Sequence, residues 1–351
     1  MQEADPTMTP MTREQALAVL QDARVLRDAQ LQCVDFSGVD LSGSELRNVD
    51  LRGANLQGAQ LHQAHWQGVQ LQAAQLQGVV AERASWQDCD ASASVWSRAQ
   101  LSHCSLQACN LDAALMDHSS ITYCDMDACT FNGTDFRHTD LTRWIVMDAQ
   151  LHSAMFEHTR LKQAFLRRCA LQQQRFPGCD LTLAMLDGCQ LQGCNFSGLH
   201  LDRTSFTGAQ LQQACFDGCT AVYVSWVDAQ WQAASLQQLR ATSCDASGAQ
   251  LQQVQARGAQ WERCMLVRTQ WQDSQLQDTR WTYCDFSHAS LDAADCANAV
   301  LSGCNAHGWS DQHTCWEGAV RDTLPTDPLL WEAEHWQPPA HLRTALPKEA
   351  V

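Results

Sequence analysis

Several features that are common in enzymes and membrane proteins are missing from this sequence of 351 residues. No apolar run is long enough to cross a bilayer, and no charged segment followed by an apolar one opens the chain. The GxSxG, P-loop, HExxH and GxGxxG motifs are also absent. We therefore expect a cytoplasmic protein without membrane association, catalytic residues, cofactor or enzymatic activity.

Positive charge is scarce as well. The chain has 23 Lys and Arg residues against 39 Asp and Glu residues, and its formal net charge is −16 at pH 7. Binding to the phosphate backbone of nucleic acids depends on a cluster of basic side chains. We therefore expect no direct nucleic-acid binding.

A repeat of five residues dominates what is present. From Leu26 to Ala306 every fifth residue is Leu, Phe, Trp, Met, Ile, Val, Ala or Cys, and the residue two positions earlier is nearly always small. A helix would spread such residues around its surface, and a plain strand would place them on alternate faces. The chain must therefore turn a corner in every unit, with one large and one small side chain pointing inward.

These units resemble the repeats of the pentapeptide-repeat family, whose consensus is A(D/N)LXX. The resemblance is carried by ANLQG (54–58), AQLHQ (59–63), CDFSH (284–288) and GVDLSGSEL around Leu41. It implies an all-β fold, a right-handed quadrilateral β-helix with about 20 residues in each of about fourteen coils. We place the β-helix at residues 26–316, a short N-terminal segment at 1–25 and a C-terminal tail or cap at 317–351.

The inward positions balance large side chains against small ones, as close packing requires. The coil centred on residues 81, 86, 91 and 96 reads Ala, Trp, Ala, Trp. Ala241 and Ala246 leave a thin region, and Trp261 follows in the next coil and could fill it. We therefore expect the volume of inward side chains in one coil to be balanced by that in the adjacent coils.

The 18 cysteines favour a structural interpretation. Most of them occupy the small inward position, where a free thiol behaves as a small apolar group. No CxxC pair suggests a zinc site, and cysteines stacked about 4.8 Å apart exceed the usual Cβ separation of a disulfide. We expect free thiols and no bound metal.

Residues 20 apart should form columns on the outside of the coil. One column, just before the large inward residues, includes consecutive apolar side chains, and the neighbouring corner column contains all three tyrosines together with arginines. Aromatic, Met and Arg side chains are enriched in interface cores, and contiguous apolar patches mark binding sites. The alternative is an exposed patch without a function. The predicted partner-binding strip consists of Tyr123, Arg143, Trp144, Ile145, Phe165, Leu183, Met185, Arg203, Tyr223, Met265 and Tyr283.

Glutamines form two further columns that read as a polar ladder. Stacked amides can bond from rung to rung, as in cross-β assemblies. We expect this ladder to be stabilising or simply polar. The first column runs from Gln172 to Gln272 and the second from Gln190 to Gln270.

The two ends of the chain have their own patterns. Thr12 and Gln15 form a capping-box pattern that predicts a helix over about residues 13–23, covering the first coil. Beyond residue 316 the repeat is lost, and Pro325 and Pro328 indicate a linker. The segment LLWEAEHW that follows is either a helical cap or a docking segment. Its docking residues would be Leu329, Leu330, Trp331 and Trp336.

Together these features favour a noncatalytic scaffold that binds protein partners, with a homodimer also open. The opening MTREQALAVLQDARVL (11–26) resembles pentapeptide-repeat proteins encoded with bacterial type VI secretion components. That resemblance implies an adaptor or accessory protein for effector loading, with a secretion effector or spike protein as partner. The alternative, implied by the family and the acidic charge, is a DNA mimic that binds or protects DNA gyrase. The column Asp40, Gln60, Val80, Gln100 gives no unbroken acidic stripe for such mimicry.

Overall fold

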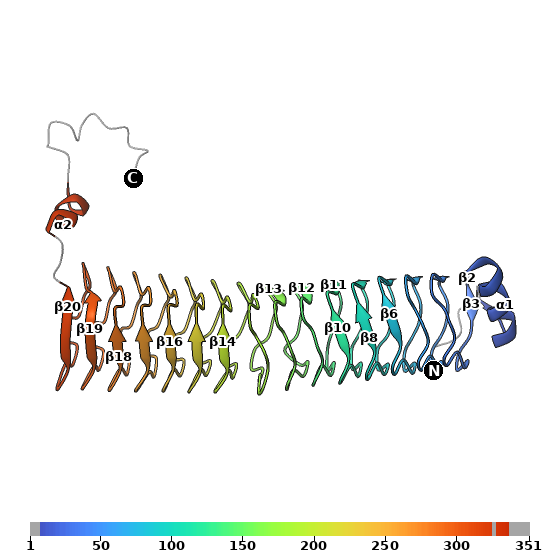
Figure 1. Cartoon of the computed structure of the whole chain (residues 1–351), viewed down its shortest axis with the longest axis horizontal. Helices are drawn as coiled ribbons and strands as arrows, with labels where there is room; N and C mark the ends of the chain where they lie inside the picture. Colours follow the sequence, from blue (N-terminus) through green and yellow to red (C-terminus); the bar gives the residue numbers. More distant parts are fainter. Residues whose placement is uncertain (1–7, 325–327, 337–351) are drawn as a thin grey trace, which may run out of the picture.

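The computed structural model describes residues 8–324 and 328–336. The backbone forms a straight stack of coils with a helix at one end (Figure 1). Parallel pairing joins each coil to the next at a spacing of 20 residues, and four pairings occur within one coil, five residues apart. Examples are Gln30↔Asp50, Asp35↔Asn55, Asp40↔Gln60 and Glu45↔His65. The chain therefore forms a four-sided β-solenoid, as predicted.

The longer pairings group into four parallel sheets. One side carries β2 (Val25–Arg27), β4 (Glu45–Arg47), β5 (His65–Gln67), β7 (Ser85–Gln87), β9 (Ser105–Gln107), β11 (Asp125–Asp127), β12 (Ile145–Met147) and β13 (Phe165–Arg167). The next side carries β6 (Val80–Glu82), β8 (Gln100–Ser102) and β10 (Ser120–Thr122). Further along that side lie β14 (His200–Asp202), β15 (Thr220–Val222), β16 (Arg240–Thr242), β17 (Gln260–Glu262), β18 (Arg280–Thr282), β19 (Val300–Asn305) and β20 (Val320–Leu324). The two-residue strands β1 (Thr9–Pro10) and β3 (Ala29–Gln30) pair at the N-terminal end.

The corners depend on a left-handed backbone residue in nearly every pentapeptide, two positions after the large inward side chain. Gly53 has φ +65° and Tyr123 has φ +58° there. Glycine adopts this conformation without steric cost, whereas other residues need compensating bonds. The N–H of Gly53 donates to the carbonyl of Gln72 in the next coil, and that of Ala54 to Leu51 across the turn, at 2.9 and 3.0 Å. Corner side chains consequently stack in columns of their own.

The inward side chains pack as the sequence predicts, with large rings filling space left by small neighbours. Trp86 and Trp96 meet edge to face within one coil, with ring centroids 5.9 Å apart. Trp226 and Trp261 belong to coils on either side of the one that contains Ala241, and their centroids are 6.0 Å apart. The thin coil is therefore filled from both sides by aromatic rings.

The small inward position has a second role that the sequence did not reveal. Most polar residues in this position donate hydrogen bonds to a carbonyl of the preceding coil. The thiol of Cys194 reaches the oxygen of Leu171 at 2.9 Å, and the hydroxyl of Thr204 reaches that of Leu181 at 2.9 Å. Burial raises the pKa of the Cys179 thiol to about 12, which keeps it protonated as a donor at neutral pH. Cys, Ser and Thr therefore substitute for Ala in this position.

The N-terminal end is closed by the predicted helix. Helix α1 (Arg13–Ala23) begins after Thr12, whose side chain accepts from the N–H of Gln15 while the Gln15 side chain accepts from the N–H of Thr12. This reciprocal arrangement confirms the capping box. Ala16 and Leu20 are buried against the first coil.

The C-terminal end extends farther than residue 316, where we placed the end of the repeats. Strand β20 continues the pairing, with Val300↔Val320 and Leu301↔Arg321 in register. The apolar inward pattern therefore ends before the backbone pairing, which continues to Leu324. The guanidinium of Arg321 lies over the ring of Trp316 at 4.7 Å and pairs with Asp311 at 2.9 Å.

Among the described residues, no helix has the length and apolar character needed to cross a bilayer.

Thiol titration tests the buried positions. All 18 cysteines are free thiols in the structure, and only Cys33 and Cys315 are exposed. We expect Ellman's reagent to modify about two thiols quickly in the native protein and all 18 after denaturation without reductant. Replacing Cys33 and Cys315 by Ser should remove the fast phase. Rapid modification of many native thiols, or fewer than 18 after denaturation, would contradict the assignment.

Candidate functional site

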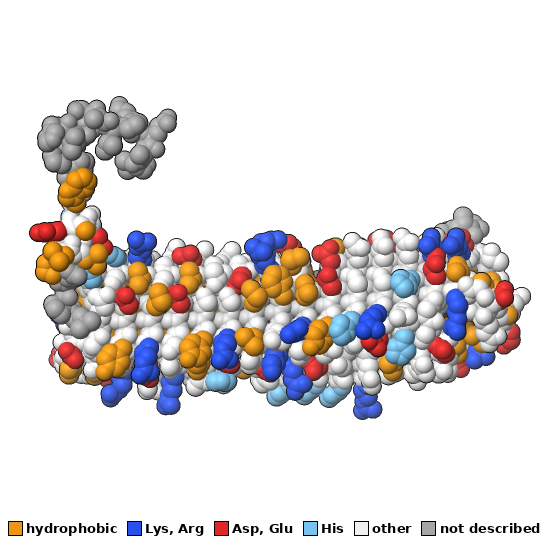
Figure 2. All heavy atoms as spheres, turned by 45° about the horizontal axis from the view of Figure 1, so that its top comes forward, with side chains coloured by type: hydrophobic (Ala, Val, Ile, Leu, Met, Phe, Trp, Pro, Cys, Tyr) orange, Lys and Arg blue, Asp and Glu red, His pale blue; other side chains and the backbone are white. Residues whose placement is uncertain are grey.

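Four apolar side chains gather on one side of the rod over three consecutive coils. On β12, Ile145 and Met147 point outward on either side of the buried Val146 and are 40% and 39% exposed. Phe165 pairs with Ile145 in the next coil, and Met185 pairs with Phe165 in the one after. We call Ile145, Met147, Phe165 and Met185 the apolar patch. Figure 2 shows hydrophobic side chains gathered over the β12 and β13 coils.

The structure confirms that Phe165 and Met185 are vertical neighbours, as the 20-residue column predicts. Met147 was missed, because only the outward position before each inward residue was read as part of the strip. The signal was available, since a strand places residues two apart on the same face. Reading both outward positions of 145–147 identifies Met147.

The corner column beside the patch carries stacked aromatic and guanidinium groups. The guanidinium of Arg143 lies 5.1 Å from the ring centroid of Tyr123, and its Nε donates to the side-chain oxygen of Gln163 at 2.9 Å. Farther along, the guanidinium of Arg203 lies 5.5 Å from the Tyr223 ring centroid. These contacts hold long side chains in place before any partner arrives.

Trp144 does not belong to the strip, contrary to our prediction. Its side chain is fully buried, and its ring centroid lies 5.7 Å from that of Phe131 and 5.4 Å from that of Phe136. The physical reason is its position two residues before Val146, which points inward whatever the size of the side chain. Trp144 therefore supports the patch from inside, and its indole cannot contact a partner.

The remaining strip residues are not all adjacent to the patch. Leu183 is half-buried at the corner beside Met185, whereas Met265 and Tyr283 are exposed several coils farther along. Polar residues occupy the intervening rungs, as the pairing of Met185 with Ser205 shows. The structure therefore brings one compact apolar group together and leaves the other predicted residues as separate contacts along the same side.

Charged groups border the apolar patch. The Arg168 guanidinium donates two hydrogen bonds to Asp148, at 2.8 and 2.7 Å, and holds the pKa of that carboxyl below its usual value. Burial, helped by the nearby Asp127, raises the pKa of Asp125, which precedes Ile145 in its column. The edge of the patch is therefore polar and its centre apolar, as in many protein interfaces.

The C-terminal segment contains a second exposed apolar group. Helix α2 (Pro328–Glu334) begins at Pro328, which suits the first turn of a helix and is not part of a linker as we predicted. Pro325 lies outside the described residues. The predicted docking residues Leu329, Leu330, Trp331 and Trp336 are all exposed.

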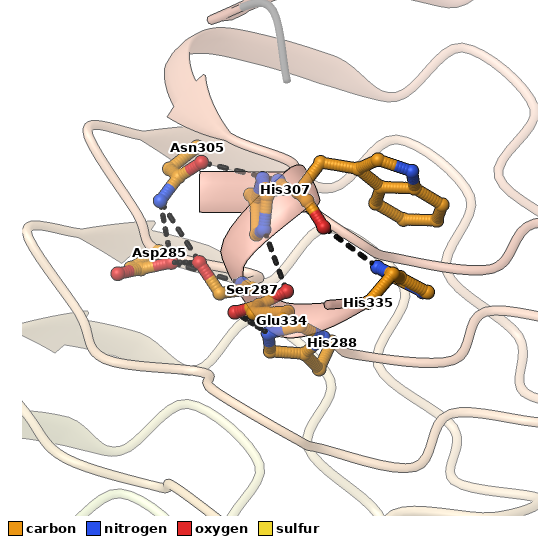
Figure 3. Close-up of polar contacts among 8 residues, drawn as sticks. Asp285, Ser287, His288, Asn305, His307, Glu334 and His335 are labelled. Atoms are coloured by element: carbon orange, nitrogen blue, oxygen red, sulfur yellow. Dashed lines mark hydrogen bonds and ion pairs between the residues drawn. The ribbon is translucent and has the colours of Figure 1, made fainter. Parts of the chain in front are cut away.

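The position of α2 favours the docking alternative over a cap. In Figure 1 the helix lies beside the last coils and does not cover the open end of the stack. Its contacts with the rod include Glu334, which accepts from His288 at 3.2 Å and from His307 at 3.1 Å (Figure 3), and the Trp331 ring, whose centroid lies 6.4 Å from that of His307. The bond from His307 and the charge of His288 hold the pKa of Glu334 below its usual value.

The glutamine columns bond to each other from one coil to the next. The amide of Gln192 donates to Gln210 at 2.5 Å, and that of Gln212 donates to Gln230 at 2.8 Å. Gln210 lies one coil above Gln190, which is two residues from Gln192. The bond from Gln192 to Gln210 therefore runs diagonally between the two columns, and the bond from Gln212 to Gln230 repeats this geometry. The ladder is therefore a zigzag across one side of the rod.

Comparison with known proteins identifies the repeats. A family model described as a pentapeptide repeat region matches residues 169–242, and one described as pentapeptide repeats (8 copies) matches residues 29–65, 97–133 and 272–305. No curated protein matches the chain.

Solved structures with detectable similarity include a trypsin-treated form of QnrB1, a plasmid-mediated fluoroquinolone resistance protein. It is 20% identical, with a TM-score of 0.31, and the match covers 56% of this chain and 90% of QnrB1. Another is HetL, a pentapeptide repeat protein involved in heterocyst differentiation regulation, from the cyanobacterium Nostoc sp. strain PCC 7120. It is 18% identical, with a TM-score of 0.21, and the match covers 90% of this chain and 98% of HetL. These similarities carry no information about the function of this chain.

Replacing Trp144 with Ala tests its buried position. The change removes a ring packed on Phe131 and Phe136, so we expect the free energy of unfolding to fall by about 3–5 kcal/mol. Changing the adjacent outward residue, Ile145→Ala, should cost less than about 1 kcal/mol. Urea unfolding followed by circular dichroism measures both. Equal effects of the two changes would contradict the inward orientation of Trp144.

Proposed function

This chain belongs to the pentapeptide repeat family, and we propose that it is a noncatalytic scaffold that binds a protein partner through the apolar patch and the neighbouring corner column. The observation that carries the proposal is the apolar patch itself. Its side chains stand outward from a regular surface on which the corresponding positions are mostly polar.

The composition of this surface suits the centre of a protein interface. Phe165 and Met185 are large apolar side chains on adjacent rungs, and Met side chains adapt to irregular partner surfaces. Tyr123 and Arg143 add residue types that are enriched among energetically important interface residues. A partner that covers the patch would remove this apolar area from water.

The rigidity of the rod adds to the expected affinity. Ile145 and Phe165 lie on strands that pair with each other, and Phe165 also pairs with the following coil. Their backbone is therefore already ordered before binding. Fewer degrees of freedom are lost when a partner associates with such a surface.

The charges indicate the chemistry of the partner. Among the residues that the structure describes, no carboxylate forms an ion pair with Arg143, whose contacts are the uncharged Tyr123 and Gln163. A partner with an apolar side chain next to a carboxylate would cover the patch with the first and form an ion pair with the Arg143 guanidinium through the second. We therefore infer a protein ligand with both groups close together.

The two finer functions remain predictions. The adaptor role in type VI secretion, with an effector or spike protein as partner, rests on the resemblance of residues 11–26. Mimicry of DNA towards gyrase requires a row of carboxylates along the rod. The column through Asp140 does not provide one, because its next rung is Arg160, which forms an ion pair with Asp140 at 3.0 Å.

Charge substitutions on the patch test the scaffold function. We expect Phe165→Asp together with Met185→Asp to weaken binding to a specific partner by about thirtyfold, which corresponds to the loss of about 2 kcal/mol at an interface hot spot. Tagged full-length wild-type and variant chains would capture partners from the cells that encode them. Mass spectrometry would quantify each captured protein, and the affinity of the best candidate would then be measured directly.

Met155→Asp provides a matched control. Met155 is also exposed but lies ten residues from Ile145 in a 20-residue coil, and therefore on the opposite side of the rod. We expect this variant to capture the same partners as the wild type. Unchanged capture by the Phe165/Met185 variant, or equal loss in the Met155 variant, would contradict the proposal. Conversion of a wild-type dimer to a monomer by the patch variant alone would identify a second copy as the partner.

A further inference from the structure

Three side chains with metal-binding atoms converge where α2 meets the rod. His288 and His307 come from the last coils and Glu334 from the end of α2, and their ligand atoms all lie within 4.8 Å of one another. The Nε2 atoms of the two histidines lie 3.2 and 3.1 Å from the two oxygens of Glu334. Figure 3 shows both rings directed towards the carboxylate. The sequence did not suggest this cluster, because its members are far apart in the chain.

The coil geometry places the two histidines at one corner. His288 occupies a left-handed corner position with φ +58°, and its N–H donates to the carbonyl of His307 in the next coil at 2.8 Å. The ring of His288 passes over Gly308, where a Cβ atom would lie 2.6 Å from its Nδ1. Glycine at 308 therefore leaves the space that the imidazole occupies.

A hydrogen-bond network through Asn305 fixes the backbone at the second histidine, His307. The backbone N–H of His307 donates to the side-chain oxygen of Asn305 at 3.1 Å. The amide of Asn305 in turn donates to Asp285 at 3.1 Å and to Ser287 at 2.9 Å in the preceding coil. His307 is only 2% exposed, so its ring is fixed before a ligand binds.

Two imidazoles and one carboxylate are the ligand set of many zinc sites. Zinc bonds to nitrogen and oxygen are about 2.0–2.2 Å long, and tetrahedral geometry then separates neighbouring ligand atoms by about 3.3 Å. The Nε2 atoms of His288 and His307 lie 3.2 and 3.1 Å from different oxygens of Glu334, and one ligand atom from each of the three residues lies within 4.8 Å of the others, so a small adjustment of side chains would bring them to this spacing. Calcium and magnesium prefer ligand sets made only of oxygen, so the two imidazoles favour zinc or a similar transition ion.

We propose that His288, His307 and Glu334 bind a zinc(II) ion and that this ion fastens α2 to the last coils of the rod. Helix α2 has seven residues and no buried side chain, and its Trp331 ring meets His307 edge to face at 6.4 Å, so a metal bridge would add to limited packing. The partly exposed contact between His288 and Glu334 adds little. A metal bridge would fix the direction in which Leu329 and Trp336 face, and three protein ligands leave a fourth position for water.

Zinc binding by the full chain tests the proposal. The protein would be treated with a chelator, dialysed and titrated with zinc chloride in a calorimeter, in a background where the exposed Cys33 and Cys315 are replaced by Ser. We expect one ion per chain. Glu334→Gln and His288→Ala should each weaken binding by at least about tenfold, since even the loss of an outer hydrogen-bond partner costs that much at metal sites.

His138→Ala is the matched control, because His138 stacks between two other corner histidines, His118 and His158, on another part of the rod. We expect its affinity for zinc to equal that of the unsubstituted background. Absence of binding in the background protein, or equal affinity in the Glu334 variant, would overturn the proposal. A thiolate-to-metal absorption band with cobalt(II) would also overturn it, since it would place the ion on cysteine.

Hydrogen exchange measures the attachment of α2 directly. We expect zinc to slow amide exchange in residues 328–336 of the background protein and to leave it unchanged in the Glu334→Gln variant. This comparison does not depend on the patch at Phe165, so its outcome is separate from that of the scaffold proposal. Zinc-dependent protection that persists in the Glu334 variant would show that the ion does not connect the helix to the rod.

Discussion

The parallel backbone bonds between residues 20 positions apart are the constraint on which the rest of this structure depends. Each coil contributes four short pairings, such as those of Gln30 with Asp50 and of Asp35 with Asn55. The left-handed corner residues make these pairings possible, because they turn the chain without inserting a loop. Once the register is set, the inward side chains fill one continuous core and the outward side chains form columns.

The fold was predictable because the five-residue period records this register directly. Individual side chains were less predictable. Trp144 was assigned to the partner-binding strip, although its position in the repeat points inward. The last strand, which ends at Leu324, was missed because backbone pairing continues after the apolar pattern has ended. The period describes which positions face inward but not how far the backbone bonds extend.

The candidate sites differ in how much of them a sequence can reveal. The contact of Phe165 with Met185 follows from counting residues, so the column predicted it. The cluster around Glu334 does not, because α2 lies outside the repeat and no period relates it to His307. Local contacts such as the stacking of Arg143 on Tyr123 depend on side-chain rotamers, which the spacing of residues leaves open.

The uninterrupted register also limits how a rod of this kind can change in length. Removing a single residue between Met147 and Phe165 would shift every later position by one, so that polar side chains would enter the core and Phe165 would no longer stand above Ile145. Adding a complete coil of 20 residues would instead keep every side of the solenoid in register and only move the two ends farther apart. Duplication or loss of whole coils is therefore the route by which such a surface can be lengthened or shortened.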